Sequence, residues 1–171
     1  MTENKKIAVI YKSHTGNTKL VADALAKAAG DSLVYCGEPK EGIDANLYLI
    51  GSWVDKGSCV SEISEFLSAL KNRKLAFFAT AGFGGSEEYY NKISDRMASV
   101  TDSSNEILGC FICQGKMPMA VRERYVKMIT ENPEDKSLEV SLKNFDEALK
   151  HPNEDDFENA KNWLAEITNG L

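Results

Sequence analysis

Five short apolar runs, each rich in β-branched or aromatic residues, are the feature that most limits how this chain can fold. The runs span residues 7–11, 33–36, 47–50, 75–80 and 107–113. Runs of this length and composition are typical of buried strands. The segments between them have apolar residues at helical spacing. Because strands alternate with helices, we predict an α/β fold with a parallel sheet covered on both faces.

The pattern changes after the fifth apolar run. Apolar residues at helical spacing predict three further helices, around 117–128, 138–149 and 157–167. The polar, Pro-containing segments 131–136 and 151–156 are interpreted as connectors within one domain. We therefore predict a single domain over residues 1–171, with an extra helical segment at about 114–156.

Composition narrows the class of protein further. The chain has 171 residues, of which 43% are apolar, enough for one full core. Its four cysteines show no framework spacing, so we predict reduced thiols in a cytoplasmic protein. We find neither a signal-peptide core nor an apolar stretch long enough to cross a membrane. A formal net charge of −6 disfavours nucleic acid as a partner and suits a basic docking surface on another protein.

The loop after the first strand carries the clearest chemical signal. It comprises Ser13, His14, Thr15, Gly16, Asn17 and Thr18 and leads directly into a helix. Hydroxyls, a glycine and free backbone N–H groups at a helix N-terminus suit a phosphate, although Ser13 and Thr15 could equally serve as helix caps. The loop lacks the G-x-x-x-x-G-K-[ST] pattern, and no G-x-G-x-x-G follows the strand. A monophosphate such as flavin mononucleotide (FMN) or a sugar phosphate is therefore favoured.

Two further loops place an aromatic residue among small residues. Trp53 follows the third strand and Phe83 follows the fourth. Either side chain alone would more often fold back into the core. Beside a phosphate loop, however, the two together favour a planar ring as ligand, because aromatics offer flat partners and glycines allow close approach.

The segments IAVIYKSHTGNTKLVADALAKA and LAFFATAGFGGSEEYYNKISDRM resemble the flavodoxins over about the first 100 residues. The resemblance implies a doubly wound five-stranded sheet of order 2-1-3-4-5 that binds FMN. It assigns the FMN phosphate to Ser13, His14, Thr15, Gly16, Asn17 and Thr18. It assigns the ring to Ser52, Trp53, Val54, Asp55, Lys56 and Gly57 on one side, and to Thr80, Ala81, Gly82, Phe83, Gly84 and Gly85 on the other. It also implies that the Gly57 carbonyl can turn toward the ring on reduction.

The chain departs from the flavodoxin pattern in two places. Gly85 stands where an acidic residue is usual, so the reduction potentials of the family cannot be transferred. The segment CQGKMPM and the helix after it are similar to flavodoxin-like proteins of anaerobic gut bacteria, one of which is the partner of a bilirubin reductase. A bilirubin-type reductase is therefore one candidate redox partner. The charged helix face with Arg122, Glu123, Arg124 and Lys127 could dock such a partner or shape the site entrance.

Three functions remain open at this point. The first is an electron carrier that takes electrons from a reductase and passes them to a redox partner. The second is an NAD(P)H-dependent quinone or flavin reductase, and the third is a flavodoxin-fold binding module without redox activity. We predict no catalytic side chain and no metal site, because the only histidines, His14 and His151, lie in unrelated segments. Cys110 and Cys113 point to opposite faces of one strand, so we expect packing roles and no disulfide between them.

Overall fold

The computed structural model describes residues 4–171, and its centre is a five-stranded parallel sheet. The strands are β1 (Ile7–Lys12), β2 (Leu33–Gly37), β3 (Leu47–Trp53), β4 (Lys74–Ala81) and β5 (Glu106–Gln114). Their order is β2-β1-β3-β4-β5, with every neighbouring pair parallel. The predicted doubly wound sheet of order 2-1-3-4-5 is confirmed.

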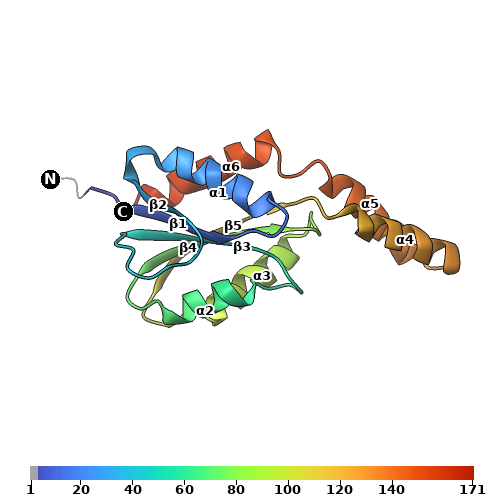
Figure 1. The fold of residues 1–171 in the computed structure, drawn as a ribbon, viewed down its shortest axis with the longest axis horizontal. Helices are drawn as coiled ribbons and strands as arrows, with labels where there is room; N and C mark the ends of the chain where they lie inside the picture. Colours follow the sequence, from blue (N-terminus) through green and yellow to red (C-terminus); the bar gives the residue numbers. More distant parts are fainter. Residues whose placement is uncertain (1–3) are drawn as a thin grey trace.

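Two pairs of helices cover the two faces of the sheet (Figure 1). Helices α1 (Asn17–Ala29) and α6 (Glu154–Thr168) lie on one face, and α2 (Ser61–Ala69) and α3 (Glu87–Ser99) on the other. A short 3₁₀ turn, η1 (Gly30–Ser32), connects α1 to β2. Strand residues alternate between the two hydrophobic clusters as the pleat requires. The neighbours Phe77 and Phe78, both fully buried, thus belong to opposite cores.

Strand β3 is three residues longer than the apolar run predicts. The sequence assigns Gly51, Ser52 and Trp53 to a loop, but they pair with Phe78, Ala79 and Thr80 of β4 as strand residues. Gly and Ser are weak strand formers. Here the register between two central strands overrides their propensity, and Gly51 and Ser52 are buried in the sheet.

Cys110 and Cys113 pack on opposite sides of β5, as expected. Cys110 packs against the α2 and α3 side, and Cys113 belongs to the α1 and α6 side. Burial raises the pKa of the Cys110 thiol to about 11 and also raises the pKa of Cys113. Both are free, protonated thiols at neutral pH, and such groups are poor nucleophiles.

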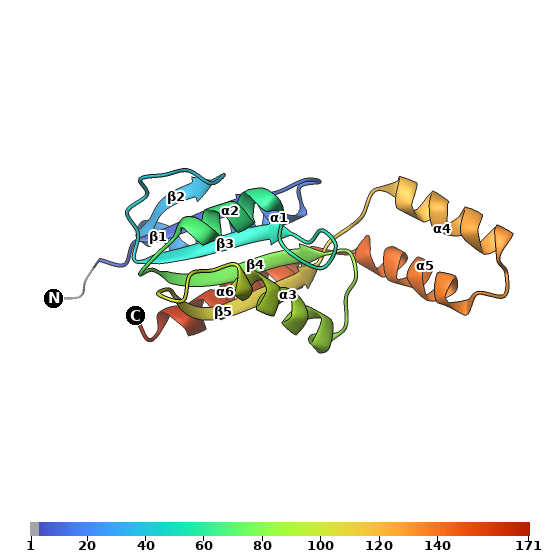
Figure 2. The same cartoon turned by 90° about the horizontal axis from the view of Figure 1, so that it is seen from below.

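The extra helices form a hairpin that extends past the carboxyl ends of the strands (Figures 1 and 2). We call the hairpin of α4 (Met119–Glu131) and α5 (Lys136–Ala148) the helical arm. Every residue of α4 is at least partly exposed. The buried side chains of the arm are Leu138, Phe145 and Ala148, all from α5. Within residues 4–171, no helix is both long enough and apolar enough to cross a membrane.

Candidate functional site

A cleft of about 320 Å³ lies at the carboxyl ends of the strands, between the three predicted loops and the segment that leads from β5 into the helical arm. Ligands of open α/β sheets bind at this edge, where the strand order reverses. Of the residues predicted from sequence, the cleft is lined by His14, Thr15, Asn17, Trp53, Val54, Lys56, Gly57, Thr80, Ala81, Gly82 and Phe83. Ser13, Gly16, Thr18, Ser52, Asp55, Gly84 and Gly85 lie outside that lining.

Three of the residues outside the lining stabilise the loops through hydrogen bonds. The Ser13 hydroxyl accepts a hydrogen bond from the Lys19 N–H at 3.2 Å, so Ser13 caps the first turn of α1. Ser52 holds the start of α2, because its hydroxyl accepts from the Val60 N–H at 3.1 Å. The buried hydroxyls of Thr18 and Thr80 share a hydrogen bond of 2.8 Å, which ties the phosphate loop to β4.

Asn17 carries the most informative polar atom in the cleft. Its side-chain N–H₂ donates to the Lys116 carbonyl at 2.8 Å. Its Oδ1 is buried and, in the described part of the chain, accepts from no group. Leaving a buried acceptor without a donor costs about 1–3 kcal/mol. A ligand with a hydroxyl next to its phosphate would supply that donor, and the ribityl chain of FMN has several.

The charge of the cleft is opposite in sign to that of the whole chain. Among the lining residues that the structure describes, the cationic side chains are those of Lys56 and Lys116, and there is no carboxylate. The formal net charge of the chain is −6. The N-terminus of α1 adds a partial positive charge at the same place. An anionic ligand such as a phosphate ester is therefore favoured.

The aromatic residues of the cleft offer flat surfaces. Trp53 stacks on His14 with a centroid distance of 5.1 Å and an interplanar angle of 28°. Phe83 is 45% exposed, so it does not fold back into the core. Trp53 and Phe83 come from the ends of adjacent strands and both line the cleft. This placement suits a planar ring.

The turn after β3 is held from outside the cleft. Asp55 and Ser58 exchange two backbone hydrogen bonds, of 2.9 and 3.0 Å, with Lys56 and Gly57 at positive φ between them. The Gly57 carbonyl accepts from Nη1 of Arg96 in α3 at 2.8 Å. Any rotation of this carbonyl toward a ligand must break that bond.

Gly57→Ala is expected to destabilise the protein by about 2 kcal/mol. The φ of +77° at Gly57 disfavours any side chain, which costs about 1–2 kcal/mol of backbone strain. An added Cβ would also overlap Nη1 of Arg96, so the hydrogen bond from Arg96 to the Gly57 carbonyl would be lost. Urea unfolding measures the effect. Gly85→Ala is the matched control, because Gly85 has φ +79° and open space around its Cβ. If the two variants lose equal stability, Arg96 does not hold the turn.

The sequence did not identify the segment from Gln114 to Pro118 as part of the site. The Gly115 N–H donates to the Ala81 carbonyl at 2.9 Å, and the Lys116 carbonyl accepts from Asn17. The segment thus bridges the phosphate loop and the loop after β4. Tyr89 also lines the cleft, although helical spacing indicates only packing for it. The topology could have indicated this segment, because β5 is parallel to the other strands and therefore ends at the same edge of the sheet.

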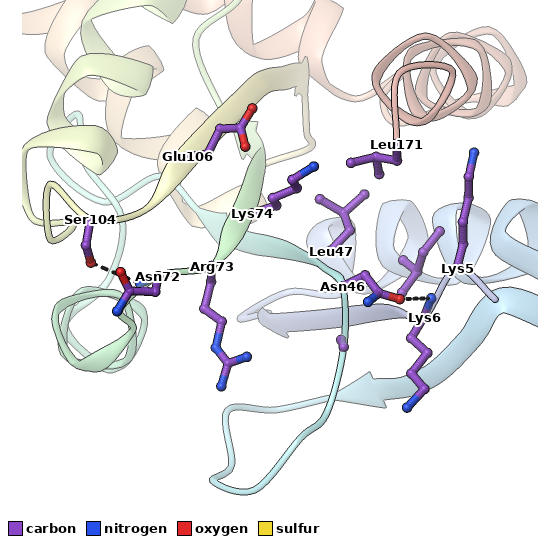
Figure 3. Close-up of a pocket in the computed structure, with 12 residues that line it drawn as sticks. Lys5, Lys6, Asn46, Leu47, Asn72, Arg73, Lys74, Ser104, Glu106 and Leu171 are labelled. Carbon is purple, nitrogen blue, oxygen red and sulfur yellow. Dashed lines mark hydrogen bonds between the residues drawn. The ribbon is translucent and has the colours of Figure 1, made fainter. Parts of the chain in front are cut away.

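A larger hollow of about 910 Å³ lies at the opposite, amino-terminal edge of the sheet (Figure 3). Its basic side chains do not converge: Arg73 and Lys6 point to one side, whereas Lys5 and Lys74 point to the other (Figure 3). Lys6 pairs with Asp44 at 2.6 Å, and Lys5 donates to the Thr168 carbonyl at 2.6 Å. The cleft at the carboxyl edge is therefore the better candidate for a ligand site.

The fold and the site together define a class. A sheet of order 2-1-3-4-5 with a Ser- and Thr-rich loop opening α1 and aromatic loops after β3 and β4 is the architecture of a flavodoxin-like protein. The family model for the flavodoxin domain matches residues 8–165, and the chain belongs to that family.

Comparisons with individual proteins agree with this assignment. The chain is 33% identical to the flavodoxin-like domain-containing protein BilS of Clostridium symbiosum, over 93% of this chain and 94% of the relative. A short-chain flavodoxin associated with a bacterial microcompartment matches with a TM-score of 0.58 and 12% identity, over 97% of this chain and 98% of that one. A flavoprotein of Lactobacillus acidophilus in complex with FMN matches with a TM-score of 0.51 and 20% identity, over 63% and 93%.

Proposed function

We propose that this protein binds FMN in the cleft at the carboxyl edge of the sheet and carries electrons between redox proteins. The observation that carries the proposal is the buried Asn17 Oδ1 at the N-terminus of α1, which accepts a hydrogen bond from no group within residues 4–171. The cationic lining and the two aromatic loops support it. The structural relative from Lactobacillus acidophilus, solved with FMN, supports the choice of ligand.

The residues of the cleft have distinct roles in this proposal. The N–H groups that open α1 and the Thr15 hydroxyl bind the phosphate. Asn17 Oδ1 accepts a hydrogen bond from a ribityl hydroxyl. Trp53 and Phe83 flank the ring and exclude water from it. FMN, when bound, supplies the one- and two-electron chemistry, while the protein fixes its position and electrostatic setting.

The partner proposed for this carrier is another redox protein, with a bilirubin-type reductase as one candidate. The similarity to two flavodoxin-like domain-containing proteins BilS supports a flavodoxin-type role, and the choice of this partner rests on the resemblance of the CQGKMPM segment. We place the carrier in the cytoplasm, because its four cysteines are free thiols. Steady oxidation of NAD(P)H by the purified protein alone would instead identify a reductase.

Titration with FMN and with riboflavin tests the proposed ligand. Quenching of flavin fluorescence is expected with both, and FMN is expected to bind about 100-fold tighter because only FMN places a phosphate at α1. Thr15→Val should weaken FMN binding about tenfold and leave riboflavin binding unchanged, since it removes a hydroxyl from the phosphate only. A wild-type protein that binds neither flavin would contradict the proposal.

A further inference from the structure

The loop after β4 is held by a residue of the helical arm. We call residues 82–85 the ring loop. Asn144 of α5 donates from Nδ2 to the Gly82 carbonyl at 3.0 Å, and its Oδ1 accepts from the Gly84 N–H at 3.3 Å. One side chain thus bonds a carbonyl and an N–H of the loop at the same time.

Gln114, the last residue of β5, completes the network. Its Nε2 donates to the Gly82 carbonyl at 3.0 Å and to Asn144 Oδ1 at 3.0 Å. Gln114 is only 8% exposed. A Cβ at Gly84 would lie 2.6 Å from Gln114 Oε1, so the loop packs directly on this amide. The backbone of the ring loop is therefore fixed jointly by the sheet and by the arm.

The rest of the arm is weakly anchored. Every residue of α4 is at least partly exposed, and the strongest contacts of α4 and α5 are with each other. The Arg122–Asp146 ion pair, at 2.9 Å, ties the two helices together and not to the sheet. Helices with so little burial open locally at low free energy. The contacts of Asn144 therefore matter for the position of the arm as well as of the ring loop.

We propose that Asn144 is a positioning residue through which the helical arm sets the affinity of the ring loop for the flavin ring. The inference rests on the proposed function and deepens it. Because one network holds both elements, ring binding and the order of the arm are thermodynamically linked, and the effect of each on the other is reciprocal. A ring that fixes the ring loop is expected to stabilise the arm as well. A partner that moved the arm would thereby change the affinity of the site for the flavin.

The proposal predicts that Asn144→Ala changes the affinities for FMN and riboflavin differently from the phosphate-loop variant Thr15→Val. Asn144 hydrogen-bonds to the ring loop and, in the part of the chain that the structure describes, to no residue of the phosphate loop. Asn144→Ala is therefore expected to raise the dissociation constants of FMN and riboflavin by the same factor, about tenfold. Lys143→Ala, at the next and exposed position of α5, is the matched control and should leave both unchanged.

A second readout follows the arm itself. Trypsin can cut α4 after Arg122, Arg124 and Lys127 once the helix opens locally. Saturating riboflavin is expected to slow this cleavage several-fold in the wild type and in Lys143→Ala. In Asn144→Ala the protection should be lost, even when riboflavin is raised enough to saturate the weakened site. A residue that served only overall stability would not change this protection by the ligand.

The outcomes separate the two proposals. If wild-type protein binds FMN and riboflavin but Asn144→Ala binds both equally well, the positioning role is overturned and the proposed function stands. If saturating riboflavin protects α4 to the same extent in the variant, the linkage between arm and ring loop is overturned. If the wild type binds neither flavin, the proposed function fails and this inference fails with it.

Discussion

Replacing Phe145 with Ala is expected to unfold the helical arm while the five-stranded sheet stays folded. Phe145 is fully buried and is the largest of the three buried side chains of the arm. Truncating a buried Phe to Ala costs about 3–5 kcal/mol. Helices of 13 residues are marginal in water without tertiary packing. Within residues 4–171, neither hydrophobic cluster of the sheet includes a residue of the arm, so no other packing compensates for this loss.

Amide hydrogen exchange, followed by peptide, measures this effect region by region. Protection from exchange should fall strongly across residues 119–148. It should remain within β3 and β4, because their buried residues belong to the two hydrophobic clusters of the sheet and not to the arm. Val140→Ala is the control, because Val140 lies on the same helix and is 67% exposed. Equal loss of protection in the arm and the sheet would mean that the two unfold as one cooperative unit. Unchanged protection in the arm would mean that Phe145 does not hold it together.

The alternation of strands and helices made the sheet predictable from sequence. The run 75–79 is apolar throughout because β4 is buried on both faces, which is the environment of a central parallel strand. Strand ends were less predictable. At Gly51 the local propensity favours a loop, but pairing with Phe78 places the residue inside the sheet. Tertiary pairing decides such boundaries, and no local pattern records it.

The candidate site was predictable as far as it depends on topology. The loops after the first, third and fourth strands meet at one edge in any sheet of this order, so His14, Trp53 and Phe83 could be assigned from sequence. The segment Gln114–Pro118 and the contacts of Asn144 could not. Their place depends on where the arm leaves the sheet, which is fixed by contacts between residues 30 positions apart in the chain.

Gly51 illustrates how a glycine next to a site can have a packing role. Gly51 directly precedes Ser52, the first residue of the loop assigned to the ring, so close approach to a ligand is one explanation for a glycine at this position. In the structure Gly51 is the cross-strand partner of Phe78, and a Cβ at Gly51 would overlap the Phe78 ring. The aromatic side chain fills the space that glycine leaves.

A double-mutant cycle between Gly51 and Phe78 is expected to show strong coupling. Gly51→Ala should cost about 1–3 kcal/mol, because the added methyl overpacks a buried site, and Phe78→Ala about 3–5 kcal/mol. The double variant should lose at least 1 kcal/mol less than the sum, since the new methyl occupies space that the ring vacates. Urea unfolding of the four proteins gives the values.

Phe77 provides the matched control for that cycle. It is also fully buried but belongs to the hydrophobic cluster on the other face of the sheet. Combining Gly51→Ala with Phe77→Ala removes a ring that the new methyl does not meet, so the two losses should add within about 0.5 kcal/mol. Coupling with both phenylalanines would point to a general shift of the sheet. Additivity with both would show that the Phe78 ring does not set the need for glycine at position 51.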